Sequence, residues 1–73
     1  MTTYKMTEYR KDSEPRVTNW TTRLFAIDTA RAILHGQGVP SDLSEHPHIT
    51  IIAADPRVEA IGTSVFTLVE TTK

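Results

Sequence analysis

Residues 28–38 read DTARAILHGQG, and within them the spacing of apolar side chains becomes that of a helix. At 100° per residue, one side of this helix carries apolar residues and the other side polar ones: Ala30, Ile33 and Leu34 against Asp28, Arg31 and His35. Asp28 suits the N-cap, and Gly36 with Gly38 suits the left-handed stop. The sequence predicts a helix over 28–35. A start at Thr21 or Thr22 ranks second, because it places Arg23 and Arg31 beside the apolar stripe.

Two strand-like stretches precede this helix. Residues 2–10 are rich in Thr and Tyr and free of Gly and Pro, and alternation places Tyr4 and Met6 on one face. Residues 11–16 bring Asp, Ser and Pro close together, which is typical of a turn. Residues 17–27 resume the strand pattern. The first half of the chain therefore predicts a β-hairpin that leads into the helix.

The second half of the chain predicts another pair of strands. Residues 39–47 read as a loop, in which residues 41–45 can form one helical turn. Residues 48–54, HITIIAA, have the strongest strand character in the chain. After a turn, residues 58–71 predict one long final strand. Gly62 indicates a bulge in that strand, because the apolar alternation does not match on its two sides.

This order of strand, strand, helix, strand, strand predicts an α+β fold: a small four-stranded, mostly antiparallel sheet with one helix on one face, as a single domain over residues 1–73. Ile51 and Ile52 are neighbours and point to opposite faces, as do Val65 and Phe66. Both faces therefore carry apolar groups, although one helix covers one face only. We expect a partner protein or a second copy on the other face, unless a loop or terminus folds over it.

Composition narrows the class of protein. The chain has 73 residues, 38% of them apolar, and no cysteine. So small a domain buries little surface, and without cysteine it has no disulfide and no thiolate zinc site. The chain contains no run of 18 apolar residues and opens without an apolar signal-like segment. These features predict a soluble cytoplasmic protein stabilised by a partner chain.

The charge is weakly polarised along the chain. Residues 1–36 carry six bases and four acids, which gives +2, and residues 37–73 carry two bases and five acids, which gives −3. A domain without a basic excess has a weak electrostatic attraction for nucleic acid. Nucleic-acid binding by the first hairpin is therefore the alternative hypothesis, with three bases on phosphates: Lys11, Arg16 and Arg23.

The chemical signatures are weak. His46 and His48 stand at i and i+2 on an extended segment and can reach one metal, but surface histidines near a strand end are common without one. Ser64 follows Gly62 and Thr63, without the second glycine of a G-x-S-x-G nucleophile turn. We therefore expect no catalytic activity, no metal and no cofactor.

The leading hypothesis is a small non-catalytic protein-binding module. It associates with itself, for example as a homodimer, and acts by occluding a partner. In its small size and its lack of catalytic motifs, the chain resembles the short accessory or inhibitor proteins carried by phages and mobile elements. The expected contact groups are four large apolar side chains and one base: Trp20, Phe25, Ile52, Val65 and Arg23.

Overall fold

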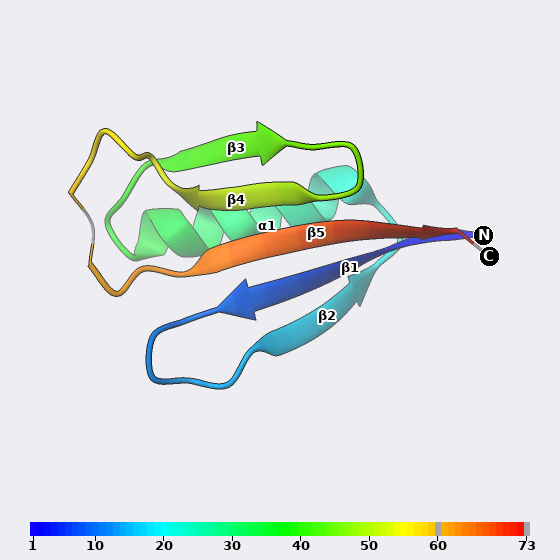
Figure 1. The fold of residues 1–73 in the computed structure, drawn as a ribbon, viewed down its shortest axis with the longest axis horizontal. Helices are drawn as coiled ribbons and strands as arrows, with labels where there is room; N and C mark the ends of the chain where they lie inside the picture. The colour runs from blue at the N-terminus through cyan, green and yellow to red at the C-terminus, as the bar shows by residue number, and fades with distance from the viewer. Residues whose placement is uncertain (60, 73) are drawn as a thin grey trace.

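The computed structural model describes residues 1–59 and 61–72. Within them the chain forms five strands and one helix (Figure 1): β1 (Thr2–Tyr9), β2 (Arg16–Trp20), α1 (Arg23–Gly36), β3 (Ser41–Glu45), β4 (Thr50–Ala54) and β5 (Val65–Thr72). The sheet order is β2-β1-β5-β4-β3, and every neighbouring pair is antiparallel. The helix lies across one face of this sheet. The predicted α+β class, with one helix and an antiparallel sheet, is confirmed.

The last strand forms the middle of the sheet. β5 pairs with β1 over eight residues, from Thr2 opposite Thr72 to Tyr9 opposite Val65. On its other side β5 pairs with β4 over only three residues, Phe66 to Leu68. The predicted first hairpin, β1 with β2, is confirmed. Two hairpin-like halves are thus joined through a strand that comes last in the chain.

The helix begins earlier than the favoured prediction. It runs from Arg23 to Gly36, so residues 23–27 belong to the helix and not to the strand predicted over 17–27. The second alternative was right about its start: Thr22 is the N-cap, with extended φ and ψ of −124° and 118°. Helical spacing puts Ala26 beside Ala30 and Leu34 in the core, which strand alternation does not require. Of the two glycines predicted as the left-handed stop, Gly38 has a φ of +83°, whereas Gly36 is the last residue of the helix.

The sheet has five strands because residues 41–45 form β3, so the predicted four strands and the helical turn at 41–45 are wrong. Leu43 is the one apolar residue of this segment, and it packs toward the core opposite Ile52 of β4. A single apolar residue gives almost no periodic signal, so pairing with β4 decides the structure here.

The final strand starts at Val65 and not at residue 58. Gly62 has a φ of +76° and lies in the loop between β4 and β5, so it marks no bulge within a strand. Residue 60, inside the predicted strand, lies outside the described residues. The mismatch of apolar alternation around Gly62 reflects a loop, because no ladder fixes the faces of these side chains.

Eight apolar residues form the core between helix and sheet: Met6, Ala26, Ile27, Ala30, Leu34, Ile52, Phe66 and Leu68. Ala26 and Ala30 have no exposed surface, and their small side chains let the helix lie close to the sheet. Trp20 packs partly buried against this core. The hydrophobic free energy of folding therefore comes from one face of the sheet.

We predict that Leu34→Ala lowers the free energy of unfolding by about 2–5 kcal/mol, because Leu34 is fully buried and its removal leaves a cavity. Leu24 lies on the same helix and is 61% exposed, so Leu24→Ala is the matched control and changes stability by less than about 0.5 kcal/mol. Urea unfolding followed by circular dichroism measures both. Equal losses would contradict the helical register.

Candidate functional site

The face of the sheet opposite the helix is covered by no described element (Figure 1). We call it the outer face. Strand alternation and register place on it mainly β-branched side chains and one tyrosine: Tyr9, Val17, Ile51, Val65, Thr67 and Val69. Tyr9, Val17, Val65 and Val69 are exposed. On the described strands its only full charges are Lys5 of β1 and Asp42 of β3. The outer face is thus a broad, almost neutral surface.

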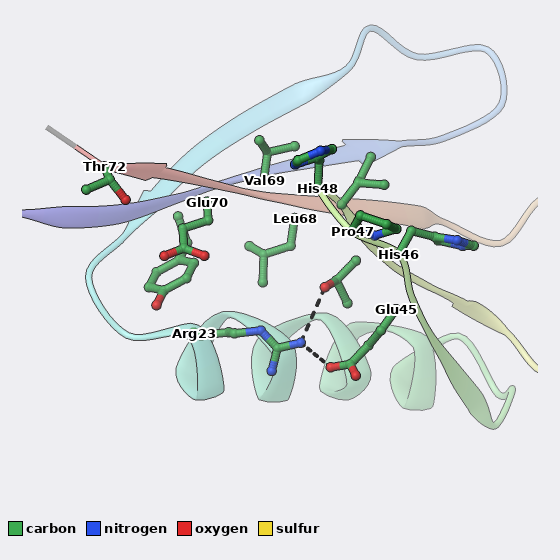
Figure 2. A pocket seen from close by; sticks show the side chains of 12 residues that line it. Arg23, Glu45, His46, Pro47, His48, Leu68, Val69, Glu70 and Thr72 are labelled. Carbon is green, nitrogen blue, oxygen red and sulfur yellow. Dashed lines mark hydrogen bonds and ion pairs between the residues drawn. The ribbon is translucent and has the colours of Figure 1, made fainter.

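A cleft of about 540 Å³ opens on the helix side of the sheet, at the start of α1 (Figure 2). Its walls come from the start of α1, the turn between β3 and β4, and the ends of β1 and β5. The residues that line it are mostly polar: Tyr4, Arg23, Glu45, His46, Pro47, His48, Ile49, Thr50, Leu68, Val69, Glu70 and Thr72. With neutral histidines, two glutamates against one arginine give the lining a net charge of −1.

The two glutamates of the cleft differ in their partners. Arg23 donates from Nη2 to Glu45 Oε1 and, at 3.3 Å, to Thr50 Oγ1. Figure 2 shows Arg23 reaching from the helix toward Glu45, while Glu70 lies toward the other end of the cleft. Among the described residues, the side chain of Glu70 has no hydrogen bond or ion pair. The carboxylate of Glu70 is therefore available to a ligand.

A buried polar network surrounds Ser64, which has no exposed surface. Its Oγ donates to Glu8 Oε2 at 2.7 Å and accepts from Gln37 Nε2 at 2.9 Å and Arg10 Nε at 3.3 Å. The backbone N–H of Ser64 donates to Gln37 Oε1 at 2.9 Å. These bonds fix the start of β5 to β1 and to the residue after the helix. Burial prevents a substrate from reaching this hydroxyl, so we interpret the network as structural.

The turn after β4 is closed by an ion pair. Asp55 accepts from the backbone N–H of Arg57 at 2.9 Å and from its Nε and Nη2 at 3.0 and 2.7 Å. The side-chain and backbone hydrogen bonds from Arg57, which stabilise the carboxylate, lower the pKa of Asp55 to about 2.

The five predicted contact residues lie in different places. Ile52 is fully buried in the core and Trp20 packs against it, so neither offers a free side chain. Arg23 lines the cleft, Phe25 is 63% exposed on the helix, and Val65 belongs to the outer face. Val65 is therefore the one of the five that the structure places on the open face of the sheet.

The three bases of the nucleic-acid alternative are also separated. Lys11 lies in the turn between β1 and β2, and Arg16 begins β2 at the same end of the sheet. Arg23 follows the other end of β2, whose five residues span about 16 Å. Arg23 is moreover bound to Glu45. The structure thus groups Lys11 with Arg16 and leaves Arg23 apart.

His46 and His48 are exposed on the turn at the rim of the cleft. His46 Nε2 lies 3.0 Å from Ser44 Oγ. Over residues 1–59 and 61–72, no three His, Cys, Asp or Glu side chains gather closely enough to hold a metal ion. The two histidines therefore contribute polar rim groups to the cleft.

Sequence reasoning missed Tyr4 and Glu70 as site residues, because they come from strands at opposite ends of the chain. The available signal was strand alternation, which places Tyr4 and Glu70 opposite each other on the helix side. No helix in the described part of the chain is long and apolar enough to cross a membrane. Comparison with protein-family models, curated proteins and solved structures finds no match to this chain.

We predict that Ser64→Ala lowers the free energy of unfolding by about 1–3 kcal/mol, because Gln37 Nε2 loses its acceptor and Glu8 keeps only the hydrogen bond from Arg10. Ser13→Ala is the control, since Ser13 is exposed in a turn. Chemical denaturation of both variants measures the difference. A loss in Ser64→Ala no greater than in Ser13→Ala would show that the network does not hold the fold.

The lowered pKa of Asp55 predicts how the stability of the fold depends on pH. Its folded pKa of about 2 lies below the ordinary value of 3.8, so its contribution is full above about pH 4 and disappears as the pH falls toward 2. The difference in Tm between the native chain and Asp55→Asn should therefore be constant above pH 5 and shrink between pH 4 and 2. Thermal melts across this range measure it, and a difference independent of pH would refute the assignment.

Proposed function

We propose that this chain is a non-catalytic protein-binding module that associates through the outer face of its sheet, with a second copy of itself as the occupant of that face. The observation that carries the proposal is the exposure of Val17, Val65 and Val69 on one uncovered face. Several exposed apolar groups on one uncovered face of a small domain are typical of an interaction surface.

The size of the outer face fits a partner of similar shape. Five strands about 4.8 Å apart and 5–8 residues long project an area of about 400–600 Å². A standard protein interface buries about 800 Å² on each partner. The outer face therefore suits a modest interface of sheet against sheet, in which a small domain gains the core that it lacks.

The charges of the outer face favour a second copy. Lys5 and Asp42 are opposite in sign and lie on opposite sides of β5, on β1 and β3. A two-fold axis along β5 places the half that contains Lys5 over the half of the other copy that contains Asp42. In this arrangement Lys5 and its copy lie on opposite sides of the axis, as do the two copies of Asp42, so like charges do not face each other. In this form the module acts by occluding a surface of its partner, as a phage accessory or inhibitor protein would.

Sedimentation equilibrium tests this proposal. We predict that the native chain associates with rising concentration, and that Val65→Lys raises the dissociation constant at least tenfold, because it puts a charge inside the interface. Phe25→Lys is the matched control: Phe25 is an exposed apolar side chain on the helix side, and its replacement should leave association unchanged.

Circular dichroism confirms that both variants remain folded. A native chain that stays monomeric at every concentration would overturn the proposal. So would dissociation by Phe25→Lys without dissociation by Val65→Lys, which would move the interface to the helix.

A further inference from the structure

We propose that the cleft beside α1 binds an extended segment of another protein, which adds as a short strand to the free edge of β5 and places a basic side chain against Glu70. This proposal does not depend on self-association.

The free edge results from the unequal lengths of neighbouring strands. β5 has eight residues and pairs with β4 only from Phe66 to Leu68. β4 begins at Thr50, and the chain before it turns back toward β3, with the His46 N–H donating to the Ile49 carbonyl at 2.9 Å. Residues 69–72 of β5 therefore have no strand partner on this side among the described residues.

This edge offers backbone hydrogen bonds. In a strand, the N–H and C=O of one residue point to the same edge, and successive residues alternate between edges. Two of residues 69–72 thus direct both groups toward the cleft, while β1 holds the opposite edge through its pairs with Thr71, Glu70 and Val69. An antiparallel strand on this edge continues the line of β4 and satisfies these groups.

The space beside this edge is large enough for such a strand. The cleft has a volume of about 540 Å³ and contains Val69, Glu70 and Thr72 in its lining. Four residues of extended chain measure about 13 Å, the same length as residues 69–72. Figure 2 shows the side chain of Glu70 pointing from β5 into the space between the sheet and the helix.

The chemistry of the cleft selects the side chain that enters it. A residue opposite Glu70 points to the helix side, where Glu70 is unpaired and Tyr4 is its direct cross-strand neighbour. A carboxylate beside an aromatic ring is a favourable environment for a guanidinium or ammonium group. The charge of Arg23 is neutralised by Glu45, which leaves the lining at −1. The residues on either side of this basic residue point to the outer side, beside Val69 and Thr71, and suit apolar β-branched side chains.

The other edges of the sheet are less suitable. β3 carries Asp42 and Glu45, and Pro40 and Pro47 flank it. Charge and proline on an edge strand discourage the addition of another strand. The β2 edge lies outside the cleft, so it has no enclosing wall and no unpaired carboxylate from the cleft lining.

Titration of the ¹⁵N-labelled chain with a synthetic tetrapeptide, acetyl-Thr-Val-Arg-Val-amide, whose residues lie opposite Thr72, Thr71, Glu70 and Val69 in that order, tests the proposal by NMR. We expect saturable binding, with shift changes concentrated at residues 69–72 and 45–50. The peptide with Glu in place of Arg should bind more weakly. The Arg peptide with N-methyl groups on its threonine and arginine should lose at least tenfold in affinity, because the residues opposite Thr72 and Glu70 then cannot donate to the strand edge.

Variants separate the charge contribution from the fold. Glu70→Gln should raise the dissociation constant of the Arg peptide about three- to fivefold, as expected for a partly exposed ion pair. Glu70→Lys should reverse the preference in favour of the Glu peptide. Glu59→Gln, which removes an exposed acid outside the cleft lining, is the matched control and should leave binding unchanged. The variant Val65→Lys should still bind the peptide, because Val65 lies at the start of β5, away from residues 69–72.

Several results would overturn the proposal: no saturable binding of either peptide, equal affinity for the Arg and Glu peptides, or no effect of N-methylation. Shift changes confined to β2 or to residues 41–44 would move the site elsewhere and overturn the proposal. Concentration-dependent shifts at residues 69–72 without peptide would show that a second copy of the chain occupies this edge, which would also overturn it.

Discussion

The core of this domain forms where a single helix packs on one face of the sheet. α1 has 14 residues and is about 21 Å long and 10 Å wide, whereas the five-stranded sheet is about 24 Å wide. The helix therefore covers the centre of one face, where Phe66, Ile52 and Leu34 have no exposed surface. It cannot reach the other face at all. The open outer face follows directly from this limit.

The cleft follows from the unequal lengths of the strands. β1 and β5 run eight residues each, while β3 and β4 run five. The two long strands thus extend beyond the hairpin of β3 and β4, and the start of the helix lies below this extension (Figure 2). Arg23 fills part of the gap by binding Glu45 and Thr50. At the opposite end of the helix, the buried Ser64 network uses its polar groups within the fold. The polar groups near the start of the helix line a cleft, where a ligand can reach them.

Local pattern predicted much of the fold, and the errors have a common cause. The α+β class, the first hairpin and the stop at Gly38 follow from alternation, turn residues and glycine conformation, all of which act within a few residues. The start of α1 was misplaced because strand alternation and helical spacing both accommodate residues 23–27. β3 was missed because Leu43 is stabilised by Ile52, a partner on another strand. The long loop before β5 was read as strand because its apolar residues resemble one.

The candidate sites were less predictable than the fold. Opposite faces of a strand can be assigned from alternation, and the open outer face was expected on that ground. The choice of face for Ile52 depended on register, which the neighbouring Ile51 left open. Tyr4, Glu45 and Glu70 line one cleft only because β5 inserts between β1 and β4, and no local pattern specifies that insertion. A site formed by strand ends therefore needs the topology before it can be recognised.

The central claim is that one face of the sheet is open in the single chain and becomes covered by association. Paramagnetic relaxation of methyl protons by a soluble gadolinium complex, recorded at low and high protein concentration, tests this most directly. We predict strong relaxation of the Val17, Val65 and Val69 methyls at low concentration and protection at high concentration, with Ile52 protected throughout. Protection of the three valines at every concentration, in a chain that sediments as a monomer, would contradict the account.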